Sequence, residues 1–453
     1  MTRPPPFRGK ILKEVNFMQR ESTGSTAPKP EMKTESGIPW RKANSWFLVI
    51  WLIMFMDYMD RSAINAVLPL LKKEFLFTDT QTGVISSCLN VTVGLLALPV
   101  AIIVDRWSRT RMISVMVFIW SLATWGTSLA NRYIHFVIAR LGVGVGEAGY
   151  NAAGYALISY YYPKKVRGTM LGIFNTGITL GYGLGMVIVG WLAHTYGWRT
   201  CFGILAIPGI LLALLVWFAP DYKTDSERGG NGKGKASVWA DLKYVFKTPV
   251  LLYIYLGSAA FHLAYQATGT FGVTFLVREF GLNIKQAAGL LGMIGLLTFL
   301  GSPVGGWLGD RFLKKTEKSR LIVAASFATL VVIAGTISLQ NAAGHLGDKS
   351  LTFTLIFWAI GGFFMAGVTP NLIGVTQEVV PTFLRATAAG FLPVVNNLLG
   401  SFPGPIIVGA ISDRTNLITA MQIVLVVSAG LTVVFVYIAT RYYAKAAAKL
   451  GSE

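Results

Sequence analysis

The chain has 453 residues, of which 53% are hydrophobic and 13% are charged. A soluble protein carries about 25% charged residues, so this chain has too little polar surface for a water-soluble body of its size. Its net charge of +19 is typical of some nucleic-acid binders, but the positions of the Lys and Arg residues follow a membrane topology and exclude a nucleic-acid partner.

The first 43 residues are polar and basic and contain several prolines. They hold no apolar stretch of about 7–15 residues, which a signal peptide requires. We therefore expect residues 1–43 to form a tail that precedes an uncleaved first membrane span.

Apolar stretches of about 20 residues, long enough to cross a bilayer as a helix, occur twelve times. They lie at 44–72, 79–105, 112–130, 133–162, 168–195, 198–220, 248–279, 284–310, 319–340, 350–380, 384–412 and 416–442. The longest break, 221–247, holds four glycines among lysines and predicts a flexible linker. The pattern predicts an all-α membrane protein with twelve transmembrane helices in two six-helix bundles, 44–220 and 248–443, and a C-terminal tail at 444–453.

The basic residues are distributed unevenly between alternate loops. Of the 40 Lys and Arg residues, 30 lie in the tails and one set of loops, and 2 lie within spans. The opposite loops hold eight: Lys72, Lys73, Arg132, Arg199, Arg278, Lys285, Lys349 and Arg414. By the positive-inside rule, both termini and the linker are predicted to be cytoplasmic, in a plasma or inner membrane.

Two short patterns recur in the two halves of the chain. Asp105-Arg106 follows the second span and Asp310-Arg311 follows the eighth. Pro-x-x-x-Arg follows the fourth span at 163–167 and the tenth at 381–385. Transporter folds are commonly built from such repeats, so the two bundles are predicted to be pseudo-symmetric copies of one six-span unit.

Several motifs together resemble the major facilitator superfamily. They are the Asp and three Arg residues at 105–111, the counterpart at 306–311, and the glycine-rich run from Arg140 to Glu147 in the fourth span. The resemblance covers residues 44 to 443. It implies a central cavity lined by the first and fourth helices, and transport of a small molecule by a monomer.

Within that superfamily, Tyr58-Met-Asp60-Arg61 and Gly146-Glu147-Ala148 are similar to two groups. One is the Spinster-like group, whose eukaryotic members export lysolipids and sphingolipids, and the other couples organic anions to protons or sodium. The anion symporters usually carry Pro after the Ala, whereas this chain has Gly149. The substrate class therefore stays open between a carboxylate and an amphiphile.

Charged side chains within spans are concentrated in two segments. Asp57, Asp60 and Arg61 lie in the first span, and Arg140 and Glu147 lie in the fourth. Each costs at least about 2.5–3.5 kcal/mol on insertion scales, so each needs a partner or a water-filled cavity. Helical periodicity allows the stripe of Arg140 and Glu147 and the stripe of Asp57 and Arg61 to face one cavity. The alternative is a set of buried ion pairs that fixes helix packing, with Asp57 on Arg61 and Asp60 on Arg140.

We expect Arg61 to anchor an anion, because a planar guanidinium binds a carboxylate at two points, and Arg140 to assist it. Asp60 and Glu147, with Asp57 as a third candidate, are expected to carry the coupled proton. The other candidate substrate contacts are polar residues along the cavity: Tyr150, Asn151, Tyr155, His262, Gln266, Asn396 and Asn397. For His262 the alternative is an ordinary packing residue.

Charged residues after the second and eighth spans are predicted to lock the two halves in one state and to release when the halves rock. This gating set comprises Asp105, Arg106, Arg109, Arg111, Asp310 and Arg311.

Other functions lack their motifs. The four His residues are scattered without metal-ligand spacing, no nucleophile is paired with a base, and no phosphate-binding loop for ATP occurs. The sequence therefore predicts no enzyme, no metal and no cofactor. It favours a proton-coupled symporter of a small organic anion, with a Spinster-like carrier of a lysolipid as the alternative.

Overall fold

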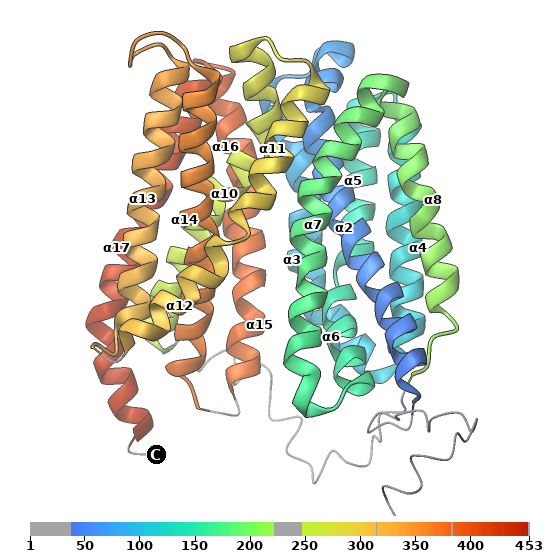
Figure 1. The fold of residues 1–453 in the computed structure, drawn as a ribbon, viewed down its shortest axis with the longest axis vertical. Coiled ribbons are helices and arrows are strands. Elements are labelled where there is room, and N and C mark those ends of the chain that lie inside the picture. Colours follow the sequence, from blue (N-terminus) through green and yellow to red (C-terminus); the bar gives the residue numbers. More distant parts are fainter. Residues whose placement is uncertain (1–37, 222–246, 314, 382–383, 452–453) are drawn as a thin grey trace, which may run out of the picture.

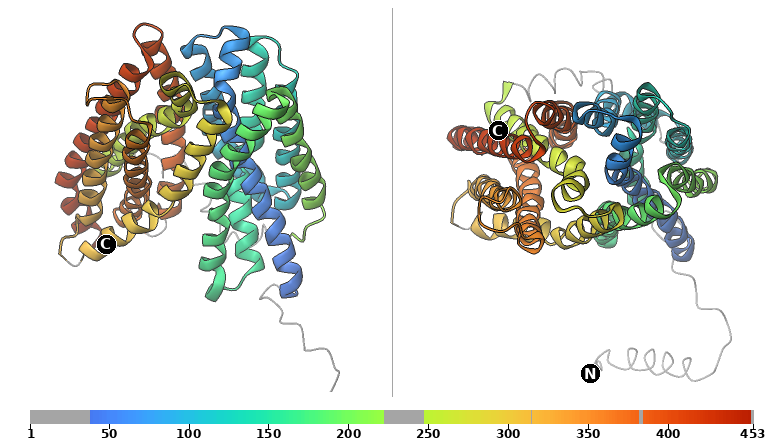
Figure 2. Two further views of the ribbon diagram at one scale, coloured as in Figure 1. Left: turned by 45° about the horizontal axis from the view of Figure 1, so that its top comes forward. Right: turned by 90° about the horizontal axis from the view of Figure 1, so that it is seen from above.

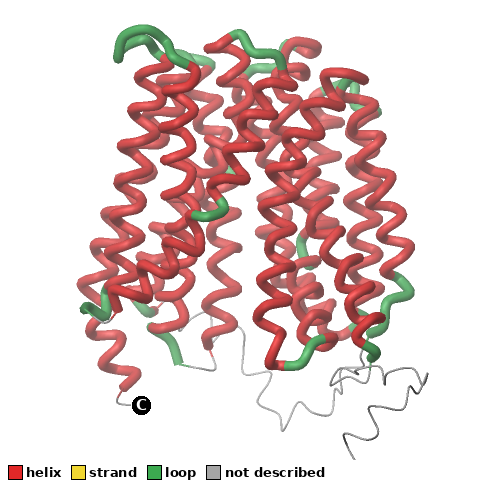
Figure 3. Tube along the Cα trace, in the orientation of Figure 1, coloured by secondary structure: helices red, strands yellow, loops and turns green. Residues whose placement is uncertain are grey.

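The computed structural model describes residues 38–221, 247–313, 315–381 and 384–451. These residues are almost entirely helical, and short loops join the helices at the two ends of the molecule (Figure 3). The predicted linker and most of the N-terminal tail lie outside the described residues.

The N-terminal half contains α2 (Trp40–Phe75), α3 (Asp79–Arg106), α4 (Arg109–Ser128), α5 (Tyr133–Glu147), α6 (Tyr150–Tyr161), α7 (Lys164–Tyr196) and α8 (Trp198–Val216). The C-terminal half contains α10 (Pro249–Phe280), α11 (Ile284–Thr298), α12 (Gly301–Leu313), α13 (Ser319–Ala342), α14 (Leu351–Glu378), α15 (Arg385–Val395), η3 (Asn396–Ser401), α16 (Pro403–Ser412) and α17 (Leu417–Gly451). The two halves stand side by side as separate bundles (Figure 1).

Each predicted span coincides with one helix or with consecutive helices. Within the described residues, nine helical stretches are long and apolar enough to cross a membrane, which identifies an integral membrane protein. The remaining three predicted spans correspond to α2, α4 and the α5–α6 pair. The count of twelve crossings therefore stays a prediction. The predicted C-terminal tail begins at 444, whereas α17 continues to Gly451.

Three spans that the sequence predicts as continuous are interrupted. The span at 133–162 breaks between Glu147 and Tyr150, and the span at 284–310 breaks between Thr298 and Gly301. At the second break the packing partner changes, because α11 packs across the interface on α7 while α12 packs on α13 and α14 of its own half. The span at 384–412 contains the π-helix η3, a deviation that is frequent at functional sites.

The two halves meet through α7 with α11 and through α3 with α16 and η3. Glycines allow the first contact: a Cβ on Gly190 would lie 2.6 Å from the Cβ of Ala288, and one on Gly183 would lie 2.8 Å from Leu296 Cδ2. These contacts involve the part of α7 near the upper end of the molecule in Figure 1. Viewed from above, the helices of both halves surround the centre of the molecule (Figure 2).

Candidate functional site

Arg61 lies between two carboxylates in the middle of the N-terminal half. Its Nη2 is 2.6 Å from Glu147 Oε2, and its Nε donates to Asp57 Oδ1 at 3.3 Å. Both carboxylates are buried, whereas the Arg61 side chain is 18% exposed. One face of the guanidinium also lies 5.0 Å from the ring centroid of Tyr58. This arginine is therefore the one member of the trio that a solute can reach.

The local helix geometry produces this trio. Asp57 and Arg61 are one turn apart on α2, so their side chains stack on one face. Glu147 is the last residue of α5, where the helix breaks before α6 begins at Tyr150. Asp57 Oδ2 and both oxygens of Glu147 have no hydrogen-bond partner among the described residues, and Glu147 Oε2 is held by the ion pair with Arg61. The trio thus retains unused acceptor positions for a proton or a ligand donor.

Asp60 and Arg140 form a second, closed cluster. Arg140 Nη1 is 3.2 Å from Asp60 Oδ2, and its Nη2 donates to Thr127 Oγ1 at 3.0 Å. Thr124 Oγ1 donates to the other Asp60 oxygen at 2.8 Å. Arg140 is 0% exposed and its guanidinium lies 5.6 Å from the Phe202 ring centroid. Four helices of the same half, α2, α4, α5 and α8, enclose the cluster.

The sequence allowed Arg140 and Glu147 to face one cavity, and the structure pairs them with different partners. Glu147 meets Arg61, while Arg140, seven residues earlier on α5, meets Asp60. The ion pairs of Asp57 with Arg61 and of Asp60 with Arg140 match the structural alternative. Arg140 and Asp60 are both buried in this structure. Substrate contact by Arg140 and proton transfer by Asp60 stay predictions.

We expect Arg140→Gln to lower the stability of the protein by about 3–5 kcal/mol, because the substitution leaves the Asp60 carboxylate buried without a counter-charge. Asp60→Asn combined with Arg140→Gln should recover part of the loss, since no uncompensated charge remains. Thermal unfolding of the purified variants measures both effects. Arg199→Gln, at an ion pair with Glu74 that is largely exposed, is the control and should cost less than about 1 kcal/mol. Equal stability of the single and double variants would contradict the assignment.

Aromatic residues from both halves lie near Arg61. Tyr58 lies close to Tyr155 of α6 and to Tyr265 of α10. Tyr155 is 37% exposed and its hydroxyl donates to Asn175 Oδ1 at 2.7 Å, while Tyr265 is 49% exposed. This arrangement agrees with a cavity-facing position for Tyr155. It adds Tyr58 and Tyr265, each of which lies directly beside a predicted site residue, Asp57 and Gln266.

Several predicted contacts lie in packed surroundings. The hydroxyl of Tyr150 is buried and donates to the Ile50 carbonyl at 2.5 Å. His262 Nδ1 lies 2.9 Å from the Ser258 carbonyl one turn earlier. Asn397 belongs to η3, where its carbonyl accepts from the N–H of Phe402. The side chains of Tyr150 and His262 thus have structural partners, and a substrate role for all three residues stays a prediction.

Two of the predicted amide contacts have an unused acceptor. Asn396 Oδ1 in η3 and Asn151 Oδ1 in α6 are buried and have no hydrogen-bond partner among the described residues. A buried amide oxygen without a partner costs free energy, which a ligand donor would recover. Gln266 is half-buried on α10, one residue after Tyr265. These three residues are the polar candidates that have room for a new contact.

The predicted gating residues are partly described. The side chains of Asp105 and Arg106 lie outside the described part of the chain. Arg109 is buried, and Arg111 lies 5.7 Å from the ring centroid of Trp217. In the other half, Asp310 pairs with Arg320 at 2.8 Å and Arg311 lies 5.3 Å from the Trp307 ring centroid. The partners of Arg111, Asp310 and Arg311 belong to their own half, and their gating role stays a prediction.

A buried polar network was not predicted. Ser86 Oγ donates to Asn65 Oδ1 at 2.6 Å and lies 2.9 Å from Thr270 Oγ1 of the other half. Asn65 is one turn after Arg61 on α2, so the spacing could have placed it on the same stripe. Ser86 and Thr270 are isolated hydroxyls in apolar helices, and nothing in their sequence distinguishes them from packing residues.

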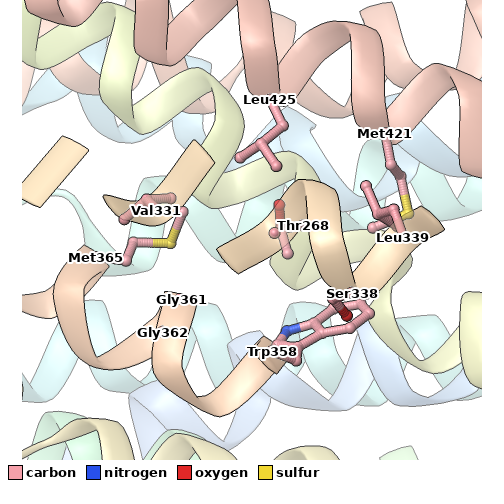
Figure 4. Close-up of a pocket in the computed structure, with 11 residues that line it drawn as sticks. Thr268, Val331, Ser338, Leu339, Trp358, Gly361, Gly362, Met365, Met421 and Leu425 are labelled. Atoms are coloured by element: carbon pink, nitrogen blue, oxygen red, sulfur yellow. The ribbon is translucent and has the colours of Figure 1, made fainter. Parts of the chain in front are cut away.

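A separate pocket lies within the C-terminal half and is lined mainly by apolar residues of α13, α14 and α17, with Thr268 from α10 (Figure 4). Its two hydroxyls, on Thr268 and Ser338, donate to backbone carbonyls. None of its lining residues is charged. The pocket therefore offers no group for charge recognition, and the candidate site is the region around Arg61.

Comparison with known proteins gives a family and a fold. The model of the Major Facilitator Superfamily matches residues 50–405. The hexuronate transporter of Bacillus subtilis (strain 168) is 24% identical over 381 residues, covering 81% of this chain and 87% of the relative. Protein spinster homolog 3 of Danio rerio is 28% identical over 398 residues, covering 85% of this chain and 80% of the relative.

Among solved structures, a bacterial homolog to the human lysosomal transporter Spinster, in an inward-facing and unoccupied conformation, has a TM-score of 0.73. It is 24% identical, and the alignment covers 91% of this chain and 98% of that chain. The nucleoside transporter NupG has a TM-score of 0.67 at 16% identity, covering 88% of this chain and 99% of that chain. At these identities the likeness shows the fold.

Proposed function

This chain belongs to the Major Facilitator Superfamily, and we propose that it is a secondary transporter that carries a small organic anion together with a proton. The observation that carries the proposal is the exposed edge of Arg61 between two buried carboxylates, Asp57 and Glu147. A planar cation held in this way is suited to two-point binding of a carboxylate.

The charges of the site explain why a proton would accompany the anion. With every group ionised, Asp57, Arg61 and Glu147 carry a net charge of −1, and the Asp60–Arg140 pair is neutral. A net charge in a low-dielectric site is costly, so one proton shared by the two carboxylates of the trio neutralises it. A bound monoanion adds a further negative charge, and a second proton compensates for it.

The same charges would couple the binding of the anion to the binding of the proton. An anion that approaches Arg61 competes with Glu147 and Asp57 for the guanidinium. A carboxylate that loses this counter-charge in a buried site gains affinity for a proton. Anion binding and proton binding therefore favour each other, which is the condition for symport. Movement of the two halves around the site would then expose it to the opposite side.

The relatives support both candidate substrate classes, a carboxylate and an amphiphile. The name of the hexuronate transporter says that it carries an organic acid. This substrate class agrees with an anion that is anchored on Arg61 and whose hydroxyl groups contact tyrosines and amides. The Spinster relatives support the alternative, in which the same arginine would bind the head group of a lysolipid. We propose that both termini are cytoplasmic, as the distribution of basic residues predicts.

The test is uptake into proteoliposomes under an inward proton gradient, with a hexuronate, a simple monocarboxylate and a lysophospholipid as substrates. We expect a carboxylate to accumulate and the accumulation to collapse when a protonophore removes the gradient. Transport of the lysophospholipid alone would favour the alternative. Carboxylate accumulation that follows a sodium gradient and ignores the proton gradient would contradict proton coupling.

A thermal-shift screen with the same three compounds reports binding without transport. A ligand at 100 times its dissociation constant stabilises the folded protein by about 2.7 kcal/mol. We expect stabilisation by a carboxylate in the wild type and none in Arg61→Gln. Equal stabilisation of both proteins would place the binding site elsewhere.

A further inference from the structure

Two aspartates join the halves at the upper end of the molecule in Figure 1, the end at which α3 and α11 begin. Asp79 is the first residue of α3 in the N-terminal half, and Asp413 directly follows α16 in the C-terminal half. Each aspartate bonds to groups of the opposite half. With Thr80, Arg278 and Ser412 they form a contact that we term the outer clasp.

Asp413 completes the N-terminal cap of a helix in the other half. The capping box of α3, formed by Thr78 and Gln81, uses the N–H of Gln81 and leaves those of Asp79 and Thr80 without a partner from α3. Asp413 Oδ1 accepts from the N–H of Asp79 at 2.7 Å, and Oδ2 accepts from the N–H of Thr80 at 2.9 Å. The Thr80 hydroxyl also donates to Oδ2 at 2.6 Å.

Asp79 of the N-terminal half in turn bonds to side chains of the C-terminal half. Its Oδ2 accepts from Arg278 Nη1 at 2.8 Å and from Ser412 Oγ at 2.7 Å, both in the C-terminal half. Lys72 of its own half donates to Oδ1 at 2.6 Å. The carboxylate of Asp79 is nearly fully buried by this arrangement. Arg278 Nη2 also donates to Oδ1, so the contacts of Asp79 across the interface include a two-point ion pair, which is among the stronger polar interactions.

Glycine permits the close approach. A Cβ on Gly409 of α16 would lie 2.6 Å from Thr80 Cα, a separation that side chains do not adopt. The helices can therefore bring Asp413 within reach of the α3 terminus only because position 409 has no side chain.

The charge of Asp413 favours the closed clasp at neutral pH. Burial by itself would raise the pKa of Asp413, but hydrogen bonds from Thr80 and from the backbone of Asp79 outweigh it and hold the pKa below its ordinary value. The carboxylate is therefore ionised when it caps α3, and its charge complements the positive end of the helix dipole.

We propose that the outer clasp is a latch that sets the balance between the states of the transport cycle that are closed and open at this end. The cap that Asp413 places on α3 is the part of the latch that a substitution can remove. Opening the site toward this end would separate α3 from α16 and would break the bonds that Asp413 accepts from Asp79 and Thr80, together with the Asp79–Arg278 pair. The proposal rests on the alternating access of the proposed transporter but not on its substrate or its coupling ion. Removal of the cap should therefore shift the equilibrium toward the state that is open at this end.

The test measures the distance between the two halves at this end in the absence of substrate. Spin labels on Arg132→Cys and Leu346→Cys, both exposed in loops at the same end, report it by electron paramagnetic resonance in lipid nanodiscs. The background replaces the two buried cysteines, Cys88 and Cys201, by Ala. We expect Asp413→Ala to raise the ratio of long-distance to short-distance molecules by about tenfold, the scale of a lost helix cap.

Two further variants and one control make the result specific. Asp413→Asn keeps one acceptor oxygen but loses the charge, so it should give a smaller rise than Ala. Ser412→Ala removes a single bond to Asp79 and serves if Asp413→Ala fails to fold. Asp348→Ala is the matched control, because Asp348 is an exposed aspartate in the turn between α13 and α14 and should leave the distances unchanged. Distance distributions of Asp413→Ala and Ser412→Ala that equal those of the control would overturn the proposal.

Failure of the latch and failure of the proposed symport are distinguishable. The distance measurement uses no substrate and no proton gradient, whereas the uptake assay reports both. A shift in distances without carboxylate uptake would support the clasp and reject the anion proposal, and the reverse result would do the opposite.

Discussion

Arg61→Lys is expected to reduce carboxylate uptake by at least about tenfold while leaving the protein folded. The guanidinium donates from Nε to Asp57 and forms an ion pair with Glu147 through Nη2, so two separate nitrogens at fixed spacing hold the two carboxylates. A lysine ammonium is a single point charge and cannot bridge both carboxylates and an incoming anion. Loss of one hydrogen bond to a charged group costs about 1.5–3 kcal/mol, which corresponds to about 10- to 150-fold in binding or rate.

Initial rates of uptake into proteoliposomes, normalised to the amount of folded protein, measure the effect. The matched control is Arg441→Lys, since Arg441 is exposed near the end of α17 and donates to the Tyr437 hydroxyl. It should transport at the wild-type rate. Wild-type uptake by Arg61→Lys would exclude Arg61 as the anion anchor.

Glu147→Gln is expected to abolish accumulation against a gradient and to preserve exchange of internal for external substrate. Gln imitates the protonated acid in size and hydrogen bonding, so the site can still bind the anion and reorient with it. It cannot release a proton, and the free energy of the proton gradient is then no longer linked to the substrate. The position of Glu147, buried and 2.6 Å from Arg61, gives it the contact that anion binding would break.

The measurement compares uptake driven by a proton gradient with counterflow of labelled substrate in the same vesicles. Glu74→Gln is the control, because Glu74 is a partly exposed carboxylate that pairs with Arg199 at the end of α2. It should leave both activities unchanged. Continued concentration of substrate by Glu147→Gln would falsify the coupling role of Glu147, and Asp57, the other carboxylate on Arg61, would be tested next.

The location of the helices and of the charged groups follows from the sequence alone. Each apolar stretch became one helix or a run of consecutive helices, because a backbone in hydrocarbon must satisfy its hydrogen bonds within the segment. The pairing of Asp57 with Arg61 could also be predicted, since residues four apart on a helix are neighbours. Of the partners of the two charged residues in the fourth span, the sequence offered Asp60 for Arg140, which the structure shows, but not Arg61 for Glu147.

Only the tertiary structure decided which charges meet and which are enclosed. Glu147 pairs with Arg61 while Arg140, seven residues earlier on α5, pairs with Asp60, and this choice depends on how α5 is positioned against α2. Three features depend on neighbours more than a hundred residues distant in the chain or on local backbone geometry. They are the break after Glu147, the π-helix at Asn396 and the cap that Asp413 places on α3 of the other half. A one-dimensional pattern determines the period of a helix and the cost of a buried charge, but the rotation of one helix against another is set by side-chain packing across the whole bundle.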